Sequence, residues 1–266
     1  MEYSEKLDFE EKSRVLEEML VRLKRYGMVR DFGEAMALEI GGSGGVFGGL
    51  LCSMLKRILV SDIADTQVQY KGEFAKLLKE KFERNGFDFP MEKIEFHVAD
   101  AMELPYRDQY FDFVVSLNAF EHIPNPLIAL REALRVTKKG GLVYLTFDPI
   151  WTADSGNHFH HLVSEPWAHI LYSTEEFCRR MIGAGANESL TREFRIGMNR
   201  QPVSVYKPGF PAELEKMNVS QIRMEEWTGC VQEEFVNHPN RFAAAKKLGC
   251  PADDLLIRGF AFCIVK

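Results

Sequence analysis

The sequence predicts an α/β fold in which a doubly wound, mostly parallel sheet carries helices on both faces. Short apolar runs that end in glycine or an acid alternate along the chain with longer segments whose apolar residues recur at helical spacing. Alternation of this kind produces βαβ units. A composition of 46% apolar and 27% charged residues over 266 positions fits a globular chain with a sizeable core. We therefore expect a Rossmann-like architecture with seven strands.

The expected strands are the apolar runs bounded by turn signals. The first stops at the cluster Gly41-Gly-Ser-Gly-Gly45, and the second and third end at Asp62 and Asp100. Strands buried on both faces read as continuous apolar runs of this length. The strands are expected at residues 35–40, 57–62, 94–99, 111–116, 142–147, 189–196 and 259–265.

Helices are expected between these runs. Ser173 followed by Glu176 is a capping box that opens a helix, and Asn85-Gly86 is a pair that ends one. The helices are expected at residues 5–27, 47–56, 68–84, 126–136 and 174–182, with further helical character around 225–236 and 241–248.

We expect one domain over residues 1–266. Two stretches that do not fit the alternation resemble insertions onto the substrate side of the sheet, because each is too small to build its own core. The parts are an N-terminal helical cap at 1–34, a sheet core at 35–196 and 258–266, and insertions at 149–172 and 197–257.

Charge and cysteine content exclude several classes of protein. The 33 basic and 39 acidic side chains give a net charge of −6, which argues against a general nucleic-acid binder. The five cysteines are scattered without a CxxC pair, so they predict reduced thiols and neither a disulfide framework nor a zinc site. The N-terminus lacks a signal-peptide pattern, and the longest uncharged run, 40–55, is too short to cross a bilayer. We expect a cytoplasmic protein without a membrane span, as a monomer or homodimer.

The glycine cluster and the acids after it predict a nucleoside-type ligand. Ligands of open α/β sheets bind at the carboxyl ends of the strands, and glycines there let backbone N–H groups approach closely. Asp62 follows Gly41 by 21 residues, the position from which a carboxylate can accept hydrogen bonds from both ribose hydroxyls. Asp100, after the third strand, adds a second acid to the same edge.

The sequence of the glycine loop restricts which kind of nucleoside ligand is expected. The dinucleotide fingerprint GxGxxG fails in every register, no Gly-Lys-Ser/Thr follows the cluster, and no Tyr-x-x-x-Lys pair occurs. A nucleoside without a pyrophosphate is therefore favoured. A nicotinamide-dependent oxidoreductase on a related fold stays open as an alternative.

Five ordered segments resemble the motifs of class I S-adenosylmethionine-dependent methyltransferases. The first is an acid followed by a glycine-rich turn, in which Ser43 stands where the motif has its middle glycine. The likeness extends over about residues 36–147 and is greatest to the group that holds quinone-biosynthesis C-methyltransferases and many small-molecule enzymes. The segments are 38–45, 60–62, 98–106, 111–122 and 130–142.

The resemblance implies S-adenosylmethionine as the cofactor and S-adenosylhomocysteine as its product. The glycine loop would line the amino-acid and ribose portion, Asp62 would bind the ribose hydroxyls, and Asp100 would accept from the adenine amino group. The cofactor-binding residues so implied are Glu39, Gly41, Gly42, Ser43, Gly45, Asp62, Ile63, Asp100, Ala101, Met102 and Asn118.

The prediction about the molecule that accepts the methyl group depends on histidines. A hydroxyl acceptor needs a general base, most simply a histidine whose pKa lies near the working pH. The candidates are His122, after the fourth strand, and His160 and His161, after the fifth. With its neighbours His158 and His169 the latter segment matches no standard zinc pattern, so no metal site is predicted. We expect methyl transfer to a small-molecule or sugar-containing acceptor, at oxygen in preference to carbon or nitrogen. A non-catalytic cofactor-binding protein is the further alternative.

Overall fold

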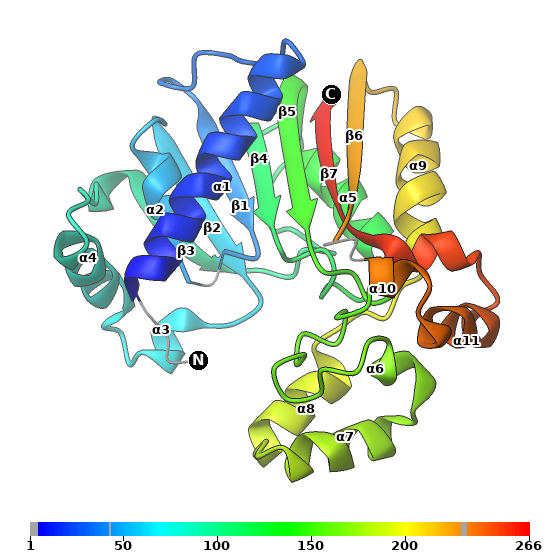
Figure 1. Cartoon of the computed structure of the whole chain (residues 1–266). Coiled ribbons are helices and arrows are strands. Elements are labelled where there is room, and N and C mark those ends of the chain that lie inside the picture. The colour runs from blue at the N-terminus through cyan, green and yellow to red at the C-terminus, as the bar shows by residue number, and fades with distance from the viewer. Residues whose placement is uncertain (1–4, 43, 230–232) are drawn as a thin grey trace.

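The structure is a computed structural model that describes residues 5–42, 44–229 and 233–266. Within them lies one seven-stranded sheet in the order β3-β2-β1-β4-β5-β7-β6 (Figure 1). Strands β1 to β5 are parallel, and β7 runs antiparallel between β5 and β6. The predicted fold class is confirmed. The strands are β1 (Met36–Ile40), β2 (Arg57–Asp62), β3 (Ile94–Val98), β4 (Phe111–Leu117), β5 (Thr137–Phe147), β6 (Gln221–Thr228) and β7 (Ile257–Val265).

The helices in the described residues flank this sheet and extend beyond one of its ends. They are α1 (Glu5–Arg25), α2 (Val46–Cys52), α3 (Thr66–Gln69), α4 (Phe74–Arg84), α5 (Pro126–Val136), α6 (Ala168–Leu171), α7 (Thr174–Gly183), α8 (Glu188–Ile196), α9 (Phe210–Lys216), α10 (Glu233–Val236) and α11 (Pro239–Leu248).

The two faces of the sheet carry separate hydrophobic cores, because successive side chains of a strand point to opposite sides. On β5, Leu142 and Tyr144 belong to the core under α1, α2 and α4, whereas Val143 and Leu145 belong to the core under α5 and α9. Figure 1 shows α1 lying across one face of the sheet with α5 behind it. This double cover leaves the carboxyl ends of β1 to β5 as the edge where a ligand can enter.

Local capping explains why α5 has the predicted bounds. The Asn125 side chain accepts a hydrogen bond from the backbone N–H of Ile128, and Pro126 occupies the first turn, where its missing N–H costs nothing. The predicted cap before α7 also forms, since the Ser173 hydroxyl accepts from the N–H of Glu176, which is one of the two hydrogen bonds of a capping box.

The predicted strand at 189–196 is wrong, because this segment is helix α8. The Asn187 side chain caps it by accepting from the N–H of Leu190. Leu190 and Phe194 are four residues apart and so lie on one helical face, which packs against α7.

The remaining strand of the sheet is β6, in a region predicted to be helical from 225. It pairs antiparallel with β7 and lies at the sheet edge, so its exposed positions carry charged residues that obscure the strand pattern. The predicted helix at 68–84 is divided into α3 and α4 because Lys71 and Gly72 both adopt positive φ.

Helices α6, α7 and α8 form a layer beyond the carboxyl ends of the strands (Figure 1). This α6–α8 layer, residues 151–198, has its own hydrophobic cluster, in which the rings of Phe177 and Phe194 stack with centroids 4.4 Å apart. Among the helices that the structure describes, none combines the length and apolar character needed to cross a bilayer.

Candidate active site

A cavity of about 420 Å³ lies at the carboxyl ends of β1, β2, β3 and β4. It brings together most of the residues that the sequence singles out, although they come from four separate loops. The predicted residues that line it are Gly41, Asp62, Ile63, Asp100, Ala101, Met102, Asn118 and His122.

Two carboxylates in this cavity are held by their own turns. Oδ1 of Asp62 accepts a hydrogen bond of 2.8 Å from the backbone N–H of Ala64, and Oδ1 of Asp100 accepts one of 2.8 Å from Met102. Such turns form because a short acidic side chain can reach the backbone two residues further on. Each side chain is thereby oriented at the mouth of its strand.

Gly41 makes the approach of β1 to the β4 loop possible. Its φ of 79° lies in the left-handed region, and a Cβ atom there would lie 2.3 Å from the Cβ of Ala119. Its N–H donates to the carbonyl of Ser61, which ties the start of the loop to β2. Only glycine satisfies both the dihedral angle and the contact.

Two other described residues of the predicted glycine loop, Gly42 and Gly45, do not line this cavity. Gly42 is buried against the Glu39 carboxyl, and Gly45 is buried where a Cβ would meet Leu78 and Phe96. Ser43 lies outside the described residues. Among the described residues of the cluster, Gly41 alone lines the cavity.

Glu39 lies under the loop rather than in the cavity. Its side chain is 4% exposed, and Oε2 has no hydrogen-bond partner among the described residues. Cβ atoms at Gly42 and Gly48 would lie within 2.7 Å of its carboxyl group, so the loop and α2 close directly over it. Burial raises the pKa of Glu39 to about 8.

We expect Glu39→Gln to remove part of the pH dependence of stability. A carboxyl with a folded pKa of about 8 binds its proton more tightly folded than unfolded. Its stabilising effect is therefore complete below about pH 4 and is lost as the pH rises towards 8. Relative to wild type, the variant should gain about 1 kcal/mol per pH unit between pH 5 and 8. Urea unfolding of the cofactor-free protein measures this.

The control for this change is Glu103→Gln, which removes a carboxyl from an exposed position. If Glu39→Gln shifts the unfolding free energy by the same amount at pH 5 and at pH 8, the carboxyl is not protonated in the folded chain.

Of the three predicted base candidates, His122 alone lines the 420 Å³ cavity. Its Nδ1 lies 2.6 Å from the carbonyl oxygen of Gly197, which fixes the ring. His160 and His161 are exposed on the loop before α6. His169 is buried between Asn157 and the carbonyl of Trp151, and burial lowers its pKa to about 4, which keeps it neutral.

Sequence reasoning missed Glu121, which precedes His122 and is fully buried. Burial raises the pKa of its carboxyl to about 8. The loop that carries it is fixed from a distance: the Asn199 side-chain amide donates to the carbonyls of Phe120 and Ile123 at 2.8 and 2.9 Å. A mainly apolar strand running into Glu-His was the available signal, but it gave no hint of the distant partners.

A second, larger cavity of about 540 Å³ lies elsewhere. It is lined by Met36 and Arg57, the first residues of β1 and β2, and by Tyr106 and Tyr110. Since it lies at the amino ends of the strands, it is not where an open α/β sheet binds its ligand. The 420 Å³ cavity is the candidate site.

The sheet order defines an open α/β protein with a cavity at the carboxyl ends of its strands, and residues 38–145 match the methyltransferase domain family. An uncharacterised methyltransferase of Mycobacterium leprae is 45% identical over 60 residues, which are 23% of this chain and 22% of that protein. The 27-O-demethylrifamycin SV methyltransferase of Amycolatopsis mediterranei is 43% identical over 54 residues, 20% of each chain.

A solved structure gives the same fold over most of the chain. Phosphoethanolamine N-methyltransferase 2 of Haemonchus contortus, in complex with phosphomonomethylethanolamine and S-adenosylhomocysteine, has a TM-score of 0.52 at 17% identity. The alignment covers 93% of this chain and 52% of that one.

Residues 38–145 therefore form a methyltransferase domain, and the sheet order around them is that of an open α/β fold. The predicted resemblance to methyltransferases is confirmed for this domain. The sequence matches span about a fifth of the length of the two curated relatives.

Proposed function

We propose that the protein transfers a methyl group from S-adenosylmethionine to a small-molecule or sugar-containing acceptor, at oxygen in preference to carbon or nitrogen. The observation that carries this proposal is the cavity in which Asp62, Asp100, Asn118 and His122 meet. The polar side chains of the cavity fit the cofactor. Oriented carboxylates accept hydrogen bonds from the hydroxyls of a ribose, and they also attract a positively charged ligand.

In this proposal, the cavity residues at the ends of β2 and β3 bind the nucleoside part of the cofactor. Asp62 accepts from the ribose hydroxyls, and Ile63, which is 73% exposed, packs on the adenine. Asp100 accepts from the adenine amino group, with Ala101 and Met102 alongside. When bound, the cofactor supplies an electrophilic methyl group on a sulfonium.

At the acceptor end, the residues position the nucleophile and exclude water. Methyl transfer is an in-line displacement, so its rate depends on holding the reacting atoms at close range. His122 lies on this side, and its contact with Gly197 joins the cavity wall to the end of α8. The α6–α8 layer would then cover the acceptor.

Oxygen is favoured because a hydroxyl must lose its proton during transfer, and the acceptor end offers an imidazole for that task. The name of the Amycolatopsis relative also specifies an oxygen. Carbon and nitrogen acceptors need less help from the protein, so they would leave His122 without a chemical role.

An acceptor screen with radiolabelled S-adenosylmethionine tests this proposal. We expect label in a hydroxyl-bearing small molecule, and we expect His122→Ala to lower kcat by about 10²–10⁴-fold. His161→Ala, which changes an exposed histidine outside the cavity, is the matched comparison. Equal pH–rate profiles for wild type and His122→Ala would remove this histidine from the mechanism, and label on carbon or nitrogen would overturn the preference for oxygen.

A further inference from the structure

The side-chain carboxyl group of Glu121 is deeply buried. The residue is 0% exposed, and neither Oε1 nor Oε2 has a hydrogen-bond partner there. Leaving a carboxylate buried and unpaired costs several kcal/mol, so buried acids are almost always paired or bound to a metal. Its position beside a cavity suggests that the partner is a ligand.

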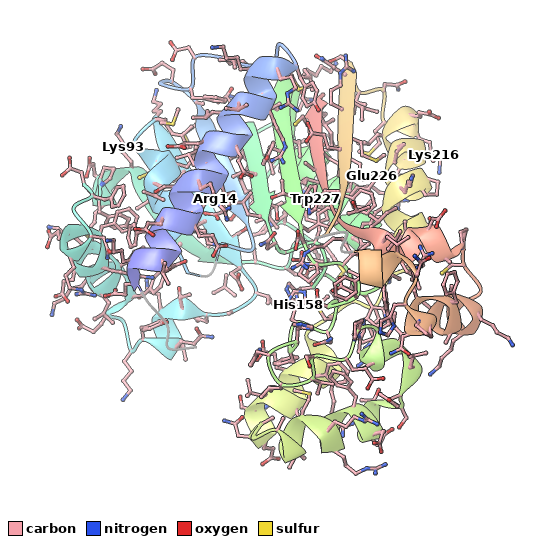
Figure 2. The ribbon with its side chains drawn as sticks, in the orientation of Figure 1. Arg14, Lys93, His158, Lys216, Glu226 and Trp227 are labelled. Atoms are coloured by element: carbon pink, nitrogen blue, oxygen red, sulfur yellow. The ribbon has the colours of Figure 1, made fainter. Side chains whose placement is uncertain are left out.

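Two imidazoles lie next to this carboxylate. One ligand atom each of Glu121, His122 and His158 lie within 4.8 Å of one another. The rings of His122 and His158 are 5.1 Å apart between centroids. His122 follows β4 and His158 follows β5, so the fold brings them together at neighbouring strand ends. In Figure 2, His158 lies between the sheet and the α6–α8 layer.

The hydrogen bonds of both rings leave one nitrogen of each without a proton. Nδ1 of His122 lies 2.6 Å from the Gly197 carbonyl oxygen, and Nε2 of His158 lies 2.9 Å from that of Pro149. A carbonyl only accepts, so in the neutral rings these nitrogens carry the hydrogen. The lone pairs are then on Nε2 of His122 and Nδ1 of His158. Metal-binding histidines are commonly oriented in this way by a backbone carbonyl.

We propose that Glu121, His122 and His158 bind a divalent cation. Two imidazoles and a carboxylate favour Zn²⁺, Co²⁺, Mn²⁺ or Fe²⁺ over the oxygen-preferring Mg²⁺ and Ca²⁺. Three protein ligands leave coordination positions open, which is typical of catalytic rather than structural sites.

The side chains must move slightly to enclose such an ion. Nε2 of His122 lies 4.0 Å from Oε1 of Glu121, whereas ligand atoms bound at about 2.1 Å from one cation lie roughly 3 Å apart. The His122 side chain is 42% exposed, so its ring can tilt about the contact with Gly197. Closing around the ion also pairs the buried carboxylate.

The role that we assign to this cation rests on the proposed function, and it makes the class of acceptor more specific. His122 also lines the 420 Å³ cavity, so an ion held there faces the acceptor. The acceptor class is then a molecule with two neighbouring oxygens, such as a vicinal diol or a hydroxyketone, that can fill the open positions. A hydroxyl bound to the ion releases its proton to solvent more readily, so His122 promotes the loss of that proton by holding the ion.

Metal titration tests the site directly. Chelator-treated protein is titrated with Co²⁺, followed by visible absorption and calorimetry, and then with Zn²⁺ in competition. We expect one Co²⁺ per chain. Glu121→Gln keeps the shape of the side chain, and His158→Asn suits its φ of 62° because asparagine tolerates that region. Each should weaken Co²⁺ binding at least tenfold.

His160→Asn is the matched control, since it removes an exposed histidine two residues away. It should bind Co²⁺ with wild-type affinity. Absence of Co²⁺ binding, or binding that Glu121→Gln and His158→Asn leave unchanged, overturns the cation site.

The two proposals fail in different ways. Methyl transfer that continues unchanged in chelator-treated protein refutes a role for the ion and leaves the methyltransferase proposal standing. One-site Co²⁺ binding that depends on Glu121, with no methyl transfer to any acceptor, retains the cation site and refutes the proposed function.

Discussion

Replacing Asp62 with asparagine should weaken binding of S-adenosylhomocysteine by about 1.5–3 kcal/mol, roughly 10- to 150-fold in Kd. The carboxylate lines the cavity at the end of β2, where it can accept from both ribose hydroxyls. Asparagine retains an oxygen that can accept from the N–H of Ala64, so the turn should persist while the charge is lost. Calorimetric titration measures the change.

The control for this change is Asp65→Asn, three residues further along. Asp65 caps α3 by accepting from the N–H of Val68, a role that asparagine fills equally well, and it does not line the cavity. It should bind S-adenosylhomocysteine as wild type does. If Asp62→Asn binds equally tightly, the cofactor does not lie where we propose.

Replacing Gly41 with alanine should destabilise the fold by about 2–5 kcal/mol and remove cofactor binding. Two costs combine: a φ of 79° is strained for alanine, and the added Cβ would lie 2.3 Å from that of Ala119. Relief of the contact moves the β4 loop away from β1, and this loop carries Asn118 and His122. Urea unfolding and calorimetry report the two effects separately.

The Gly86→Ala variant separates the cost of backbone strain from the cost of the steric contact with Ala119. Gly86 has a φ of 77°, but nothing lies within 4 Å of where its Cβ would be. This variant should lose only the backbone contribution, about 1–3 kcal/mol, and keep its cofactor affinity. Equal losses in both variants would show that the packing of Gly41 on Ala119 adds nothing.

The parts of the fold that the sequence predicts well are those that local signals determine. An asparagine cap and a proline define the start of α5, and the acids at the ends of β2 and β3 stand in the chain where the strands stop. These signals act within a few residues. Eight of the predicted site residues line one cavity.

The parts that could not be predicted depend on distant partners. β6 exists because β7 pairs with it, so its charged sequence alone resembles a helix. His122 gains its contacts from His158, after β5, and from Gly197, after α8. Helix α8 is different: Leu190 and Phe194 carried a local helical signal that a strand interpretation overlooked.

The place of β7 has a consequence for synthesis of the chain. It is the last strand along the described sequence, yet it lies inside the sheet, and β6 joins the other strands only through it. A growing chain therefore keeps β5 as an open edge until residues 257–265 have left the ribosome, and an open apolar edge invites pairing with other chains. Proteolytic loss of those residues would expose the same edge and detach β6, while the strands that bear the candidate cavity stay paired.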